Sequence, residues 1–143
     1  MNKGDCYEAN FLRFFEAKND DFVLVHAMRE IVSEWWGGHC FILDTKTDTV
    51  YDFSLSAEQF GIGEEGIAKK EIYEQWNIQE DGLYMYFEYS FEDAVALAYE
   101  EEHYGAWELL YEMWQHKEWS YYMKEYFMPK FQPKQSAVQE LNK

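Results

Sequence analysis

Two short apolar segments, residues 39–44 and 49–53, flank the turn-rich stretch Thr45-Lys46-Thr47-Asp48. Short runs of strand-forming residues on either side of turn residues are typical of a β-hairpin. A hairpin joins antiparallel neighbours, whereas parallel strands need a much longer crossover. This part of the sequence therefore restricts the chain to folds that contain an antiparallel sheet.

The remaining segments place helices and further strands around the hairpin. We expect helices over about 6–18, 64–76, 90–102, 104–117 and 118–127, and strands over 22–28 and 83–89. Residues 29–38 fit either more strand or a loop. Because strands mostly cluster and helices mostly cluster, the expected fold class is α+β: a small antiparallel sheet packed against an N-terminal helix, with a helical C-terminal third.

The length and the apolar content indicate one folded domain. The chain has 143 residues, of which 48% are hydrophobic and 20% are aromatic, far too many for a disordered segment. Both prolines, Pro129 and Pro133, occur near the end, where the sequence becomes polar and non-periodic. We expect a compact domain over residues 1–128 and a mobile tail over residues 129–143.

The charge balance excludes several classes of partner. Asp and Glu number 28 against 12 Lys and Arg, which gives a net charge of −16. This charge disfavours direct binding to nucleic acid or to an anionic membrane surface, since both depend on basic residues. We find no apolar run of about 20 residues for a membrane helix and no signal-peptide pattern. The expected location is the cytoplasm, with Cys6 and Cys40 as reduced thiols.

Cys6 lies at the expected start of the first helix, where Asp5 is a candidate N-cap and Glu8 its capping-box partner. The thiolate is the nucleophilic form of cysteine, and the N–H groups and dipole at a helix start stabilise that anion. Asp5 and Glu8 oppose the anion by charge repulsion. Cys6 is therefore a candidate nucleophile if a histidine reaches it.

His39 is the best candidate for that histidine, because it begins an expected strand and can point towards the helix start. If the hairpin turns at residues 46–47, Phe41 lies opposite Asp52, and alternation puts His39 and Phe41 on one face. Asp52 is then a diagonal neighbour of His39, within reach of its ring. Asp44 falls on the opposite face and is the weaker candidate, although a turn of different length would reverse this choice.

The order of these motifs resembles the core of transglutaminase-like and papain-like cysteine hydrolases. Gly-x-Cys opens a helix, Gly-His-Cys-Phe-Ile-Leu lies on a strand, and Val-Tyr-Asp-Phe-Ser lies on the next, all within residues 4–54. The resemblance implies Cys6 as nucleophile, His39 as general base and acid, and Asp52 as the orienting group. The Cys-to-His spacing is shorter than in that superfamily, no Gln precedes Cys6, and Phe41 stands where transglutaminase-like members commonly carry Trp.

The chemistry that this resemblance implies is acyl transfer from an amide, isopeptide or ester, through a thioester, with no cofactor. The substrate would be a protein or peptide. The backbone N–H of Cys6 is one expected donor to the oxyanion, and the second donor remains open among Asn2, Trp35 and Trp36.

Other chemically capable residues have structural interpretations. Cys40 alternates away from His39, which favours a small buried apolar role. His26 lies within an apolar strand and is expected to be a hydrogen-bonded core histidine, or otherwise a second base. Glu100-x-x-His103 matches half of a di-iron helix motif, but the second half is absent, so we expect no metal.

Two further classes of function remain open. The first is a non-enzymatic acidic inhibitor that imitates nucleic acid and occupies a basic protein groove, as phage-type inhibitors do. It requires one continuous acidic ridge, to which Glu88, Glu92, Asp93, Glu100, Glu101 and Glu102 would contribute. The second is an interaction module or homodimer that uses the aromatic C-terminal helices. Their stripe consists of Trp107, Leu110, Tyr111 and Trp114, followed by Trp119, Tyr122, Tyr126 and Phe127.

Overall fold

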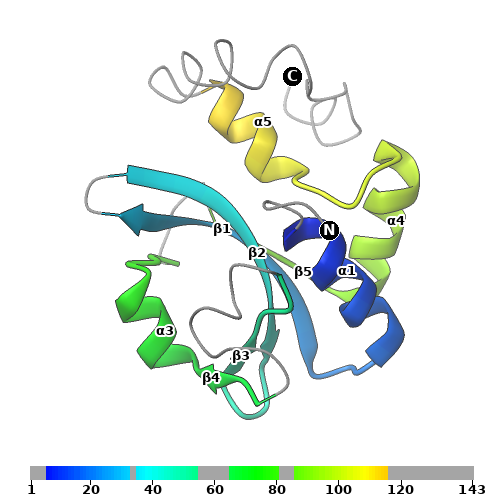
Figure 1. The fold of residues 1–143 in the computed structure, drawn as a ribbon. Helices are drawn as coiled ribbons and strands as arrows, with labels where there is room; N and C mark the ends of the chain where they lie inside the picture. Colours follow the sequence, from blue (N-terminus) through cyan, green and yellow to red (C-terminus); the bar gives the residue numbers. More distant parts are fainter. Residues whose placement is uncertain (1–5, 33–34, 55–64, 81–85, 116–143) are drawn as a thin grey trace.

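A computed structural model describes residues 6–32, 35–54, 65–80 and 86–115 (Figure 1). The described elements are α1 (Cys6–Ala17), β1 (Phe22–Val32), β2 (Trp35–Asp44), β3 (Thr49–Tyr51), β4 (Ile67–Ala68), α3 (Lys69–Gln75), β5 (Tyr86–Tyr89), α4 (Phe91–Glu101) and α5 (Glu108–Gln115). The fold class is α+β, as the clustering of strands and helices predicts.

The five strands form an antiparallel sheet in the order β4-β3-β2-β1-β5. Figure 1 shows α1 and α4 on one face of this sheet and α3 on the other. Within the described ranges, none of the helices has both the length and the apolar composition that crossing a bilayer requires.

Alternation along the strands divides the core into two clusters, one on each face of the sheet. The cluster under α3 contains Val25, Ala27, Phe41, Leu43, Val50, Ile72, Tyr73, Trp76 and Ile78. The cluster under α1 and α4 contains Cys6, Phe11, Phe14, Leu24, Cys40, Ile42, Tyr89, Ala94 and Trp107. Each helix thus buries its apolar stripe against alternate residues of the same strands.

The hairpin register agrees with the prediction from the sequence. Leu43 pairs with Val50, and Asp44 pairs with Thr49. The Asp44 carboxylate accepts a 3.0 Å hydrogen bond from the Lys46 N–H, which stabilises the turn rather than the candidate site. Of residues 29–38, which fitted either strand or loop, 29–32 continue β1 and 35–38 begin β2, while 33–34 lie outside the described residues. The strand β2 thus starts at Trp35 and not at His39.

The expected helix over 64–76 is wrong in its first part, because residues 67–68 form the edge strand β4. Gly66 has φ +72°, and a Cβ there would lie 2.5 Å from Cγ2 of Thr49. Glycine thus lets the chain approach β3 closely enough for Ile67 to pair with Val50. This pairing depends on a distant segment and leaves no strand signature in the local sequence.

The expected helix over 104–117 also begins too early, because α5 starts at Glu108. Gly105 has φ +122°, which no helix accommodates, and the Trp107 indole N–H donates to the His103 carbonyl at 3.0 Å. The predicted cap, Asp5, the helix over 118–127 and the tail over 129–143 lie outside the described residues.

Candidate functional site

Cys6 is the first residue of α1, and its side chain is 5% exposed. It packs on the sheet face that also carries Cys40 and Ile42. The first N–H groups of a helix have no partner within that helix, and together with the dipole they favour an anion at this end. The expected position of Cys6 at a helix start is thus confirmed.

His39 and Asp52 form a buried pair, with His39 Nε2 lying 2.5 Å from Asp52 Oδ2. His39 is 3% exposed and Asp52 is 1% exposed. The pair follows from the register, because Asp52 comes immediately after β3, one step beyond the pairing of Tyr51 with Ile42. The diagonal approach expected from the hairpin therefore occurs.

The charge of Cys6 and a hydrogen bond to it are among the causes that raise the pKa of His39, so the thiol lies beside the ring. Because Asp52 occupies Nε2, the nitrogen left for the sulfur is Nδ1. Among the described residues, β3 pairs with β2 only from Asp44 to Ile42, and beyond that point the Asn10 side chain of α1 bonds to the Cys40 carbonyl of β2. The structure thus joins sulfur, imidazole and carboxylate in one buried series.

Electrostatics within this series favour a protonated ring beside the Asp52 carboxylate. Burial disfavours the imidazolium, but the charge on Cys6 and the hydrogen bonds to Asp52 and Cys6 outweigh it and raise the pKa of His39 to about 8. Burial alone would raise the pKa of Asp52, yet the hydrogen bonds from His39 and Asn10 and the charge on His39 lower it to about 2. At neutral pH the ring is therefore cationic and the carboxylate anionic.

Asn10 is a member of this site that the sequence did not reveal to us. Its side chain is fully buried, and its Nδ2 lies 2.9 Å from Asp52 Oδ1. The signal for it was present: Asn10 follows Cys6 by one helical turn, on a face that is otherwise apolar. Trp76 is a second such neighbour, with its ring centroid 5.3 Å from that of His39.

The other expected site residues are only partly described. Trp35 and Trp36 belong to the first residues of β2 and pair with Val32 and Glu30, but their side chains lie outside the described part. Asn2 also lies outside it. The second oxyanion donor therefore remains a prediction.

Cys40 and His26 are neighbours on the sheet face opposite to the His39 ring, where they pair across β1 and β2. Cys40 is fully buried, as predicted, and burial raises the pKa of its thiol well above the usual value. His26 is a core residue, also as predicted, but neither of its ring nitrogens has a hydrogen-bond partner among the described residues. The expectation of a hydrogen-bonded histidine is thus wrong.

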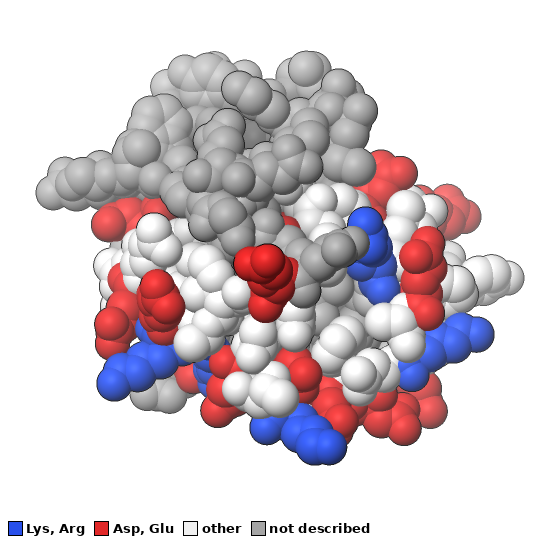
Figure 2. Space-filling view, turned by 60° about the horizontal axis from the view of Figure 1, so that its bottom comes forward, with Lys and Arg blue, Asp and Glu red and all other residues white. Residues whose placement is uncertain are grey.

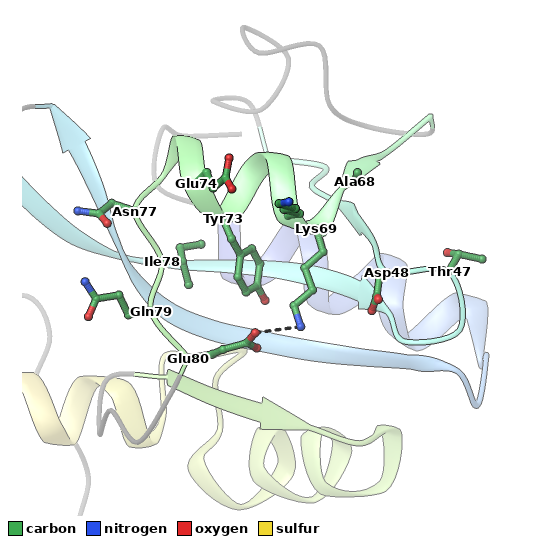
Figure 3. Close-up of a pocket in the computed structure, with 11 residues that line it drawn as sticks. Thr47, Asp48, Ala68, Lys69, Tyr73, Glu74, Asn77, Ile78, Gln79 and Glu80 are labelled. Atoms are coloured by element: carbon green, nitrogen blue, oxygen red, sulfur yellow. Dashed lines mark ion pairs between the residues drawn. The ribbon is translucent and has the colours of Figure 1, made fainter.

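A separate pocket of about 810 Å³ opens on the α3 side of the sheet. Figure 3 shows Tyr73 as its floor and the ion pair between Lys69 and Glu80, whose charged atoms lie 3.0 Å apart. None of Cys6, His39 and Asp52 lines this pocket. It is therefore distinct from the candidate site.

Across the described residues, no three or more His, Cys, Asp or Glu side chains gather into a group able to hold a metal ion. In comparisons with known proteins, no family model, no curated protein and no solved structure matches the chain. The case for any function therefore depends on the geometry of the site.

Proposed function

We propose that the protein is a cysteine hydrolase or acyltransferase of the papain-like or transglutaminase-like kind, acting on an amide, isopeptide or ester. The observation that supports it most is the series from Cys6 through His39 to Asp52, assembled from a helix start, a strand and the end of the next strand. This is the arrangement of nucleophile, base and orienting group that covalent catalysis requires.

In the first half-reaction the Cys6 sulfur attacks the carbonyl carbon of the substrate and forms a C–S bond. The C–N or C–O bond to the leaving group breaks, and the leaving amine or alcohol takes the proton from His39. The product is a thioester on Cys6. General acid–base help of this kind contributes about 10²–10⁴-fold to a rate.

In the second half-reaction water or an amine gives a proton to His39 and attacks the thioester carbonyl. The C–S bond breaks, the acid or the new amide leaves, and sulfur and imidazolium are restored. Asp52 holds Nε2 of His39 throughout and so keeps Nδ1 directed at the sulfur. We expect the N–H of Cys6, at the helix start, to donate to the oxyanion of both tetrahedral intermediates.

The low exposure of Cys6 and His39 sets a limit on what reaches the sulfur. Side chains that are 5% and 3% exposed admit a narrow acyl group or an extended chain more readily than a bulky one. We propose that the scissile carbonyl is presented on an extended peptide or a slender side chain, with the leaving group outside.

The proposal is tested by alkylation with iodoacetamide, a small reagent, followed by peptide mass spectrometry. We expect Cys6 to react well below pH 8 and faster than Cys40, and His39→Ala to slow Cys6 at least about tenfold. Cys6→Ala and Cys40→Ala are matched controls, since both remove one small buried thiol. Equal rates at the two cysteines in the folded protein would overturn the proposal.

A second measurement addresses acyl transfer itself. Incubation with p-nitrophenyl acetate should give a burst of p-nitrophenol equal to the enzyme concentration and an acetyl group on Cys6. The burst should persist in Cys40→Ala and disappear in Cys6→Ala. A burst that survives Cys6→Ala would place the nucleophile elsewhere.

No observation favours the acidic-inhibitor alternative. Its ridge would include Glu101, which is 6% exposed and therefore cannot contribute a surface charge to it. Figure 2 shows acidic and basic side chains mixed with uncharged ones over one face of the molecule. A partner with a basic groove remains an expectation from the net charge alone.

A further inference from the structure

We propose that Asn10 is the positioning residue of the candidate site, holding the nucleophile-bearing helix, the histidine strand and the orienting carboxylate in register. This inference rests on the proposed function for its catalytic meaning. Its geometric content, a single amide that joins all three segments, stands on the contacts of the side chain itself.

Four hydrogen bonds meet at the Asn10 side chain. Its Nδ2 lies 2.9 Å from the Cys6 carbonyl oxygen, 3.0 Å from the Cys40 carbonyl oxygen and 2.9 Å from Asp52 Oδ1. Its Oδ1 accepts from the Phe53 N–H at 2.9 Å. A primary amide has two N–H donors, so the three acceptors share them, and the amide oxygen accepts one further bond.

Each of these bonds fixes one part of the site. The bond to the Cys6 carbonyl ties the side chain to the first turn of α1. The bond to the Cys40 carbonyl ties α1 to β2 at the residue next to His39. The bond to Asp52 Oδ1 occupies one carboxylate oxygen, so that the other faces His39 Nε2.

The chemistry of the position requires an amide. An aspartate at residue 10 would place a second carboxylate beside Asp52 and oppose its ionisation. An apolar side chain would remove all four hydrogen bonds in a fully buried place, including the one that the Phe53 N–H donates. Asn offers both donors and an acceptor with no charge, which suits all four neighbours.

The test is the titration of the His39 ring by NMR in Asn10→Ala and Asn10→Ser. If Asn10 holds Asp52 against the ring, the His39 pKa should fall by about one unit in Asn10→Ala and by less in Asn10→Ser, whose hydroxyl still donates one hydrogen bond. Leu109→Ala is the control, because it also empties a buried position but lies in α5, which supplies none of the site residues named above. It should leave the His39 pKa unchanged.

Alkylation of Cys6 in the same variants measures the catalytic consequence. We expect Asn10→Ala to slow it by roughly tenfold to a hundredfold, since small displacements of reacting groups have effects of this size. Leu109→Ala should alkylate at the wild-type rate while it remains folded. A His39 pKa that stays at its wild-type value in folded Asn10→Ala and Asn10→Ser would overturn the inference.

The two proposals fail in different ways. If Cys6 in the wild-type protein reacts no faster than Cys40, but the Asn10 variants still shift the His39 pKa, the enzymatic proposal fails and the positioning role stands. Should neither variant fold, the wild-type protein supplies the measurement. The Asn10 side-chain amide protons should exchange slowly and shift with the titration of Asp52, and fast exchange without a shift would contradict the role.

Discussion

Asp52 uses both of its carboxylate oxygens, one for His39 and one for Asn10 and the Ser54 N–H. Asp52→Asn keeps the shape and removes the charge. The imidazolium loses its fixed anion, so the His39 pKa should fall by about one to two units and Cys6 alkylation at pH 7 should slow. Asp44→Asn, in the same hairpin but on the opposite face, should change neither the His39 pKa, measured by NMR titration, nor the rate of Cys6 alkylation. Equal effects of the two substitutions would contradict the pairing.

At the residue scale, the members of the site could be predicted wherever a local pattern fixes a direction. Cys6 follows from the helix start, and His39 and Asp52 follow from the alternation and register of the hairpin. Asn10 could not be placed, because its acceptors lie at Cys40 and Asp52, far away in the sequence. Only the tertiary structure shows that a polar residue on an apolar helix face has partners.

At the element scale, the start of α4 depends on one side chain. The Ser90 hydroxyl accepts a hydrogen bond from the Asp93 N–H at 3.2 Å, as the capping pattern predicts. Ser90→Ala should lower the free energy of unfolding by about 1 kcal/mol in a urea titration. Ser90→Asp keeps an acceptor at the cap and should lose little. If Ser90→Ala and Ser90→Asp lowered the free energy of unfolding equally, the hydrogen bond at the cap would not contribute to the stability of the protein.

The segment between α4 and α5 depends on a glycine. A Cβ on Gly105 would lie 2.7 Å from Cε1 of His26 and 2.9 Å from Cδ1 of Tyr7, and φ there is +122°. Gly105→Ala should therefore destabilise the protein by about 2 kcal/mol, measured by thermal unfolding.

A double variant separates the two causes of that loss. His26→Ala removes the nearest contact, so Gly105→Ala should cost less in that background than in the wild type. Additive losses would mean that backbone strain alone accounts for the effect.

The elements themselves were predicted best where their signals are local. The hairpin, α1 and α4 follow from turn residues, periodicity and a cap. The strand β4 was missed because its two residues pair with β3, which is distant in the sequence. The start of α5 was placed too early because Gly105 adopts its conformation against the distant His26. Both errors concern segments whose conformation is decided by contacts with other parts of the chain.

At the scale of the whole molecule, two buried histidines should give the stability a maximum near pH 6.5. Burial, with smaller contributions from His103 and His39, lowers the pKa of His26 to about 3. The neutral His26 side chain therefore makes its full contribution to the free energy of unfolding above pH 6.5. As the pH falls, this histidine is protonated more readily in the unfolded chain, which lowers the free energy of unfolding by roughly 3 kcal/mol at pH 4. The raised pKa of His39 acts in the opposite direction, so its contribution is lost as the pH rises from 6.5 through about 8.

The measurement is the melting temperature at a series of pH values, in the wild type and in His26→Leu. The variant removes the group that must be neutral and keeps an apolar side chain of similar size. Between pH 6.5 and 4 the melting temperature of the variant should fall less steeply than that of the wild type. Above pH 6.5 the two melting temperatures should depend on pH in the same way. If the melting temperature of the variant fell as steeply below pH 6.5 as that of the wild type, the loss of stability in acid would be due to the carboxylates and not to His26.

The way in which three segments supply the candidate site has a consequence for the order of events in the life of the chain. The sulfur, the ring and the carboxylate come from three separate segments, and they meet only when the first helix docks beside a hairpin made later in synthesis. On the proposed function, the Cys6 thiol of a growing or partly unfolded chain lacks these two partners and is not activated. Its reactivity, once measured, would report on complete folding as faithfully as on chemistry.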